Sequence, residues 1–230
     1  MREREIRLER TDLAFLRNRW QDVCIGLGLN DKPGQTETSV FERTIKPYTE
    51  RKGFRNLDQP NFMLRLLSQY RSRLKDPLDV DFAVFFRGVC YVAGSFRNEE
   101  DSARFAQVHL AFMGADNRLI SNVSGLIMAT RDHRVVPGED SDRAYFLDCE
   151  RAIMGTDEAS YREYAKRTAL DSQQLGPVQF VWERLVFLQG LVGRRIFSTG
   201  EMHKRFHSRA QANIEREIIE LNLIRRTLGH

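Results

Sequence analysis

The chain has 230 residues, of which 41% are hydrophobic and 15 are phenylalanine, so it can form one well-packed domain and is not a disordered chain. No apolar run reaches the roughly 18 to 20 residues that a membrane-spanning helix needs, so membrane insertion is not expected. The formal net charge of +4 is mildly basic.

Arginine supplies most of the positive charge, with 30 arginines against 6 lysines. Because a guanidinium makes planar, bidentate contacts with carboxylate and phosphate, this bias favours protein interfaces or the RNA backbone. The alternative is that these arginines lie on solvated helix faces and pair with the 32 acidic residues. The absence of a long basic block favours the solvated faces, and nothing indicates DNA sequence readout.

The cysteines and the first residues indicate the expected cellular compartment of the protein. Cys24, Cys90 and Cys149 are far apart and form no CxxC pair, which argues against a disulfide framework and a zinc knuckle. Residues 1–10 are densely charged and do not resemble a secretory signal. We therefore expect an intracellular protein, in the cytoplasm or the mitochondrial matrix, with a charged extension at 1–10 and one domain over 11–228.

Helical periodicity runs through the first half of the chain. We expect Asp76 to cap a helix that begins at Pro77, with Arg87 and Gly88 interrupting it, and loops at 28–38 and 131–140. The apolar stripes comprise Leu13, Leu16, Trp20, Val23, Cys24 and Leu27, then Met63, Leu66, Leu67, Tyr70 and Leu74, then Phe82, Phe85, Phe86, Val89, Cys90 and Ala93.

The second half is helical as well. Asn98 is the expected N-cap of a helix that carries Phe105, Val108 and Phe112 and stops at Gly114. Further helices are expected at about 119–130, 141–154, 157–170, 177–191 and 201–228. Because no convincing alternating strand or repeat is present, the fold class is an all-α, single-domain helical bundle.

Five segments, taken in order, resemble a family of metal-dependent phosphohydrolases in the HD-domain superfamily. They read GFRNLDQ (53–59), FRGVCY (86–91), NEEDSA (98–103), TRDH (130–133) and FLDCERAIMG (146–155). The segments GRRIF (193–197) and RAQANIEREI (209–218) look like the closing helices of that family. The resemblance covers roughly residues 12 to 224 and implies an HD-domain-like helical bundle.

The resemblance also implies that the metal ligands are lost. The family holds its metal with a histidine, an adjacent His-Asp pair and a distant aspartate, and these positions carry Gln59, Arg87, Gly88 and Glu150 here. Only Glu150 is an anionic ligand, and Arg87 would repel a cation. The implied protein is a pseudoenzyme with no catalytic residue, no metal and no cofactor.

Arg87 needs a counter-charge if it is buried. We hypothesise that it fills the former metal position and pairs with Asp148, Glu150 or both; the alternative is an exposed arginine on a helix face. Arg55, Glu99, Thr130, His133 and Asp148 are the other expected pocket residues. His133 is expected to bond near Thr130 or Asp148, and Glu99 and Glu100 to complement the helix dipole.

Two further features weaken the case for a site. His203 and His207 have the spacing of a metal pair, but we expect a solvent-facing pair because no zincin-like glutamate accompanies them. The segment KRTALDS (166–172) departs from the family pattern, so the resemblance does not predict a retained substrate pocket.

Three functions remain open at this stage. The first is a catalytically inactive structural or scaffold subunit of a larger protein or ribonucleoprotein assembly, with other protein subunits as partners and RNA as a further one. The second is a nucleotide- or phosphate-binding module that uses Arg55 and Arg87. The third is a metal-dependent phosphohydrolase with unorthodox ligands.

Overall fold

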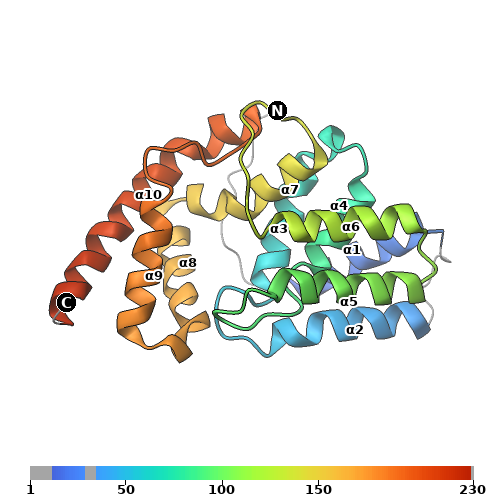
Figure 1. Ribbon diagram of the computed structural model, residues 1–230. Coiled ribbons are helices and arrows are strands. Elements are labelled where there is room, and N and C mark those ends of the chain that lie inside the picture. Colours follow the sequence, from blue (N-terminus) through green and yellow to red (C-terminus); the bar gives the residue numbers. More distant parts are fainter. Residues whose placement is uncertain (1–11, 29–34, 229–230) are drawn as a thin grey trace.

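The computed structural model describes residues 12–28 and 35–228, and this part of the chain forms one bundle of helices with no β-strand (Figure 1). The all-α, single-domain prediction is confirmed. None of these helices is both long and apolar enough to cross a bilayer. The helices are α1 (Leu13–Gly26), α2 (Gln35–Thr49), α3 (Asp58–Gln69), α4 (Pro77–Phe86), α5 (Asn98–Phe112), α6 (Asn117–Ala129), α7 (Asp142–Arg151), α8 (Glu158–Asp171), α9 (Pro177–Gln189) and α10 (Gly200–Thr227), with 3-10 turns η1 (Arg71–Arg73), η2 (Ala152–Gly155) and η3 (Gln173–Leu175).

Most predicted helices lie within a few residues of their expected bounds. α2 differs, because it begins at Gln35, inside the expected loop 28–38. The predicted helix at 141–154 is α7 followed by the η2 turn. The charged extension at 1–10 lies outside the described residues, as does most of the first loop.

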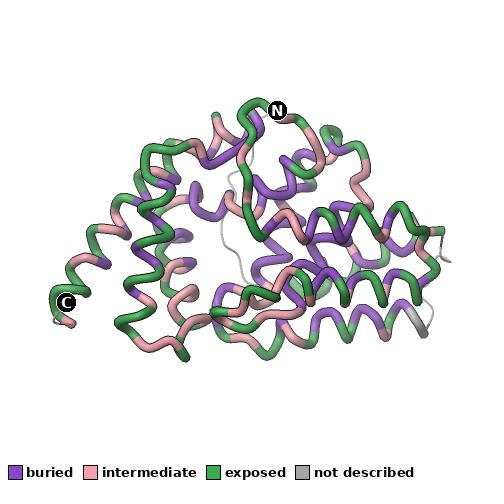
Figure 2. The backbone as a smooth tube through the Cα atoms, in the orientation of Figure 1, coloured by how far each residue is buried: buried purple, intermediate pink, exposed green. Residues whose placement is uncertain are grey.

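An aromatic cluster forms the centre of the N-terminal helices. The Trp20 ring lies edge-on to Phe82 at 5.7 Å and to Phe85 at 5.1 Å between centroids, and tilts against Phe41 at 5.6 Å. Edge-to-face ring pairs of this kind stabilise the core beyond what the burial of the rings contributes. Every residue of α4 from the third onward is buried, as the purple centre of Figure 2 shows. The end of α4 is therefore fixed deep in the domain.

α4 ends immediately before Arg87, so the prediction that Arg87 and Gly88 interrupt a continuing helix is wrong. The Tyr48 hydroxyl accepts the N–H of Gly88 at 2.9 Å and donates to the carbonyl of Phe85 at 3.1 Å. Arg51 donates to the carbonyl of Gly88 at 2.5 Å. These side chains take the backbone groups that another helical turn would have used, so the helix stops here.

α5 corrects two predictions. It begins at Asn98 itself, whose side chain bonds the backbone N–H and carbonyl of Val92 at 2.8 and 2.9 Å and closes the preceding loop. Val108 and Phe112, predicted for the apolar face, are exposed. The buried residues are three small ones and a leucine, and they allow close packing against α6, namely Ser102, Ala103, Ala106 and Leu110.

A buried ion pair joins the three C-terminal helices. Arg184 on α9 donates to Glu217 on α10 at 2.8 and 3.0 Å, and Tyr161 on α8 donates to the same carboxylate at 2.5 Å. Arg184 and Glu217 are each 7% exposed. Burial acts to lower the pKa of Arg184, but Tyr164 and Glu217 raise it above its ordinary value. The pair is therefore charged and desolvated.

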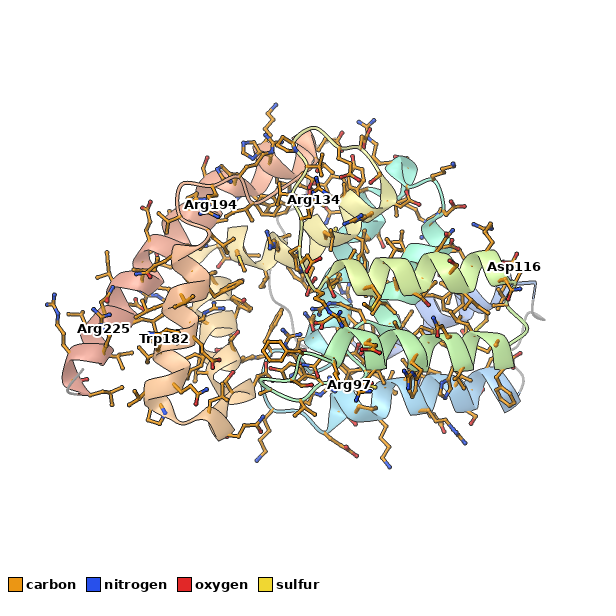
Figure 3. All side chains as sticks on the ribbon, in the orientation of Figure 1. Arg97, Asp116, Arg134, Trp182, Arg194 and Arg225 are labelled. Carbon is orange, nitrogen blue, oxygen red and sulfur yellow. The ribbon has the colours of Figure 1, made fainter. Side chains whose placement is uncertain are left out.

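The outer face of these helices leaves large apolar side chains uncovered. Trp182 on α9 is 61% exposed and borders a groove with Arg225 of α10 (Figure 3). Val178 and Val186, one helical turn before and after Trp182, are exposed as well. Isolated exposed apolar residues are ordinary, but a stripe at this spacing forms a patch.

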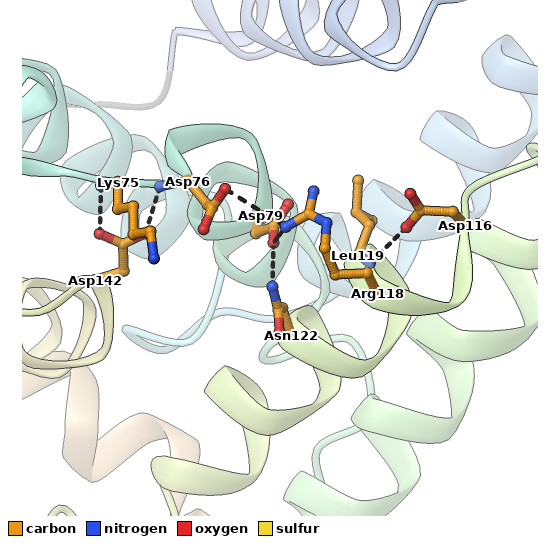
Figure 4. A network of polar contacts seen from close by, with 8 residues as sticks. All are labelled: Lys75, Asp76, Asp79, Asp116, Arg118, Leu119, Asn122 and Asp142. Atoms are coloured by element: carbon orange, nitrogen blue, oxygen red, sulfur yellow. Dashed lines mark hydrogen bonds and ion pairs between the residues drawn. The ribbon is translucent and has the colours of Figure 1, made fainter.

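A polar network ties the start of α4 to α6 and α7 (Figure 4). The Asp142 carboxylate accepts the backbone N–H of Asp76 at 2.6 Å. Arg118 pairs with Asp76 at 3.4 Å and with Asp79 at 3.3 Å, and Asn122 donates to Asp79 at 2.8 Å. Asp76 does precede α4, as predicted, but its side chain pairs with Arg118 and does not cap the helix.

Candidate functional site

A cavity of about 710 Å³ lies between the central helices and the α8–α9 pair. Its walls come from α3, the residues after α4, the start of α5, the loop after α6, α7, η2, α8 and α9. Its polar lining residues are Arg55, Gln59, Tyr91, Glu99, Arg87, Thr130, Arg131, Asp132, His133, Glu150, Arg151, Thr168, Asp171, Ser172, Glu183 and Arg184. The volume falls within the range of about 300 to 1,000 Å³ that is typical of small-molecule sites.

Seven of the nine residues that the sequence nominates line this cavity. They come from five separate stretches of the chain, and they are Arg55, Gln59, Arg87, Glu99, Thr130, His133 and Glu150. Gly88 and Asp148 do not line it.

Arg87 lies at the inner end of α4 and is 7% exposed. Its Nη2 forms an ion pair with Oε1 of Glu150 on α7. The counter-charge is therefore Glu150 alone, and the alternative of an exposed arginine is wrong. Because the aromatic cluster fixes the end of α4, the guanidinium is held where two helices from distant parts of the sequence converge.

The remaining donors of Arg87 have no partner. Its Nε and Nη1 are both buried and make no hydrogen bond to any residue within 12–28 and 35–228. Burial lowers the pKa of Arg87 to about 9, and the nearby charge of Arg55 contributes in the same direction. Arg87 is still cationic at neutral pH. An unpaired buried donor on a charged group is costly, so these atoms call for a partner in the cavity.

His133 follows α6 in a left-handed conformation, with φ of +45°, and contacts the same carboxylate. Its Nε2 lies 2.6 Å from Oε2 of Glu150. Burial, then the charges of Arg151 and Arg87, hold the pKa of His133 well below its ordinary value, so the imidazole is neutral. The contact does not have hydrogen-bond geometry, so Oε2 of Glu150 and Nδ1 of His133 are both buried without a hydrogen-bond partner among the described residues.

The predicted partners of His133 are wrong. The Thr130 hydroxyl donates instead to the carbonyl of Ile127 at 2.8 Å. Asp148 lies on the opposite side of α7 from the cavity lining and accepts the backbone N–H groups of Ser198 and Thr199, both at 2.8 Å. Burial raises the pKa of Asp148 to about 6, although these two donors act to lower it. Asp148 thus attaches α7 to the start of α10.

Gly88 has a structural role. A Cβ atom at this position would lie 3.1 Å from the Tyr48 hydroxyl, which is tighter than ordinary contact. The small residue lets Tyr48 reach the backbone and turn the chain, so that Arg87 faces the cavity and position 88 does not.

The residues at the four positions that the resemblance likens to metal ligands do not fit a divalent cation. Glu150 is already engaged by Arg87 and His133, Gln59 is a weak neutral donor, and Arg87 brings a positive charge to the centre. Among residues 12–28 and 35–228, no three His, Cys, Asp or Glu side chains are grouped so as to hold a metal. His203 and His207 stack at 4.2 Å and are half-buried, so the expected solvent-facing pair is also wrong.

Several cavity residues escaped prediction. Asp171 accepts the backbone N–H of Arg55 at 3.1 Å and so holds the Arg55 segment against α8. The Arg55 guanidinium lies 4.4 Å from the centre of the Tyr91 ring. Arg151 and Arg184 also line the cavity. No local pattern in the sequence joins residues 91, 151, 171 and 184, which meet only through tertiary packing.

The glutamates of α5 lie where the sequence places them. Glu99 and Glu100 are in the first turn of α5, where their charge complements the helix dipole. Glu99 lines the cavity, and Glu100 pairs with Arg104 at 3.7 Å.

Comparison of the chain with known protein families, curated proteins and solved structures finds no match.

Proposed function

We propose that this protein is a non-catalytic domain that binds a small anion in the central cavity without a metal ion. The observation that carries the proposal is Arg87, a buried cation that lines the cavity and has two donors without partners. One carboxylate, Glu150, engages only Nη2. An anion in the cavity would satisfy donors that the protein leaves open.

The electrostatics of the cavity support an anionic ligand. The Arg55 charge lowers the pKa of Arg87, which means that two like charges oppose each other across the site. An anion between the two guanidinium groups would relieve this repulsion. Phosphate and carboxylate are the groups that arginine recognises best. The cavity is also lined by the carboxylates of Glu99, Asp132, Glu150, Asp171 and Glu183, so the preference for an anion is local to the end that holds Arg55 and Arg87.

Isothermal titration calorimetry with inorganic phosphate tests the proposal on protein treated with a chelator. Arg55→Gln removes one charge and leaves the Arg87–Glu150 pair in place, and we expect it to weaken phosphate binding about tenfold or more. Arg104→Gln is the matched control, because Arg104 is exposed on α5 and does not line the cavity. No measurable binding to wild type, or equal loss in both variants, would overturn the proposal.

The non-catalytic part has its own test. Wild-type protein is assayed for phosphatase activity with manganese, magnesium, cobalt and nickel, alongside Glu150→Ala. We expect no turnover in either protein. Metal-dependent turnover that Glu150→Ala abolishes would show that the chain is a phosphohydrolase with unorthodox ligands.

A second candidate function is a structural subunit of a larger assembly, with another protein as the partner. The exposed side chains of Val178 and Trp182 on α9, which border the same groove, favour it, because apolar patches on a helix commonly mark protein contacts. Purification from the native source at low and high salt, with and without nuclease, tests it. A stoichiometric protein that Trp182→Glu releases would support the subunit role, and a partner lost only with nuclease would indicate RNA.

A further inference from the structure

The α9 side of the central cavity carries several apolar residues beside the polar Glu183 and Arg184. Phe180, Val186, Phe187, Gly190 and Leu191 all line it. Phe187 is 41% exposed although it borders a cavity, so much of its ring faces open space. An exposed aromatic ring on a cavity wall offers contact area that no part of the described protein covers.

The Phe187 ring is held in place from beneath. The Arg184 guanidinium lies 5.4 Å from the centre of the Phe187 ring and 5.3 Å from the centre of the Tyr164 ring. Arg184 is itself fixed by its two bonds to Glu217. Because a cation under one face orients the ring, Phe187 presents a preset surface to a ligand and loses little freedom when a ligand packs on it.

The size of the cavity also exceeds what a simple ion needs. Its volume of about 710 Å³ is suited to a drug-sized ligand, whereas a phosphate or carboxylate group alone fills only a small part of such a space. The volume beyond Arg87 is bounded in part by Phe180, Val186 and Phe187 of α9. A ligand that matches both ends has an acidic group and an apolar body.

We infer that the cavity binds an organic anion whose acidic group meets Arg87 and Arg55 and whose aromatic or acyl body packs on Phe187. This inference rests on the proposed anion site and adds the class of ligand. The shared chemistry is an organic phosphate or carboxylate, and the experiment separates the two by using a matched pair of compounds for each head group.

The experiment measures dissociation constants for methyl phosphate and phenyl phosphate, and for acetate and benzoate, by calorimetry. Wild type, Phe187→Ala and Trp182→Ala are compared. We expect the aromatic compound of at least one pair to bind wild type about tenfold more tightly than its small counterpart. Phe187→Ala should remove that difference and leave the small compound unaffected. Trp182 lies on the same helix but lines the other groove, so Trp182→Ala should change neither affinity.

The outcomes distinguish this inference from the proposed function. If methyl phosphate or acetate binds but the aromatic partner binds no more tightly, the anion site stands and the inference is wrong. If none of the four compounds binds, the proposed function fails and the inference fails with it. If Phe187→Ala weakens the binding of small and aromatic compounds equally, the inference is also wrong, because Phe187 would then only support the fold. Thermal unfolding of each variant shows whether the substitution has destabilised the fold.

Discussion

The Arg184–Glu217 pair provides a quantitative test of how the C-terminal helices are held. Glu217→Gln keeps the shape of the side chain and removes its charge. The Arg184 guanidinium then remains buried without a counter-charge, and breaking a buried pair in this way costs about 3 to 5 kcal/mol. Since roughly 2 to 4 °C in Tm corresponds to 1 kcal/mol in a domain of this size, we expect Tm to fall by about 6 °C or more.

Urea and thermal unfolding at pH 7, followed by circular dichroism, measure the effect. A triple variant with Arg184→Met, Glu217→Leu and Tyr161→Phe removes both charges and the hydroxyl that would lose its acceptor. It should be more stable than Glu217→Gln by about 2 kcal/mol or more, because no unpaired charge stays buried, although the Tyr164 hydroxyl loses its 3.4 Å bond from Arg184.

The control is Glu220→Gln, an exposed residue on the same helix that pairs with Arg162 at 3.7 Å. Exposed pairs contribute little, so its unfolding free energy should change by less than about 1 kcal/mol. If Glu217→Gln lowers Tm by less than about 3 °C, or if the triple variant is equally unstable, then the pair is solvated and the reasoning is wrong.

Three further predictions concern the central site and its supports. Burial holds the pKa of His133 in the folded protein well below its ordinary value. Below pH 6.5 the unfolded chain therefore binds a proton at residue 133 and the folded protein does not. The free energy of unfolding consequently decreases by up to about 1.4 kcal/mol per pH unit as pH falls. His133→Asn tolerates the positive φ and should remove this part of the slope in unfolding free energy between pH 7 and 5; an unchanged slope would contradict the burial of the imidazole. Gly155→Ala would place Cβ 2.5 Å from an α10 carbonyl oxygen and should lower the free energy of unfolding in urea by about 2 kcal/mol or more. Gly125→Ala places Cβ within 4 Å of nothing and should stabilise helix α6 by about 0.5 to 1 kcal/mol. The reverse order of stabilities would contradict the close packing of Gly155 against α10. Tyr48→Phe leaves the N–H of Gly88 and a carbonyl of α4 unpaired, so it should cost about 1 to 3 kcal/mol and weaken phosphate binding, and full stability would argue against its role at the turn.

Most of the residues that the family resemblance nominated gather around the cavity. Arg55, Gln59, Arg87, Glu99, Thr130, His133 and Glu150 do share one cavity. Membership of the HD-domain superfamily remains a prediction. The prediction that Asp148 lines the pocket was wrong because of the direction in which its side chain points. Asp148 precedes Glu150 by two residues on α7, and this spacing places the two carboxylates on different sides of the helix.

Prediction of the buried face of each helix from sequence meets the same limit. The wide apolar face of α4 was predicted because nearly every position there is apolar and burial does not depend on register. On α5, Val108 and Phe112 are exposed, whereas the buried residues are Leu110 and three small ones. Periodicity assigns the larger apolar residues to the core, but close packing against α6 favours small side chains, and that choice depends on a neighbouring helix.

The sequence by itself determined that the chain is helical, because periodicity and caps are local properties. Only the tertiary structure decided which carboxylate faces Arg87, that two of its donors lack partners, and that Phe187 lines the far wall. Those facts depend on where separate helices converge and on how much water they exclude, and both depend on distances between residues far apart in the chain.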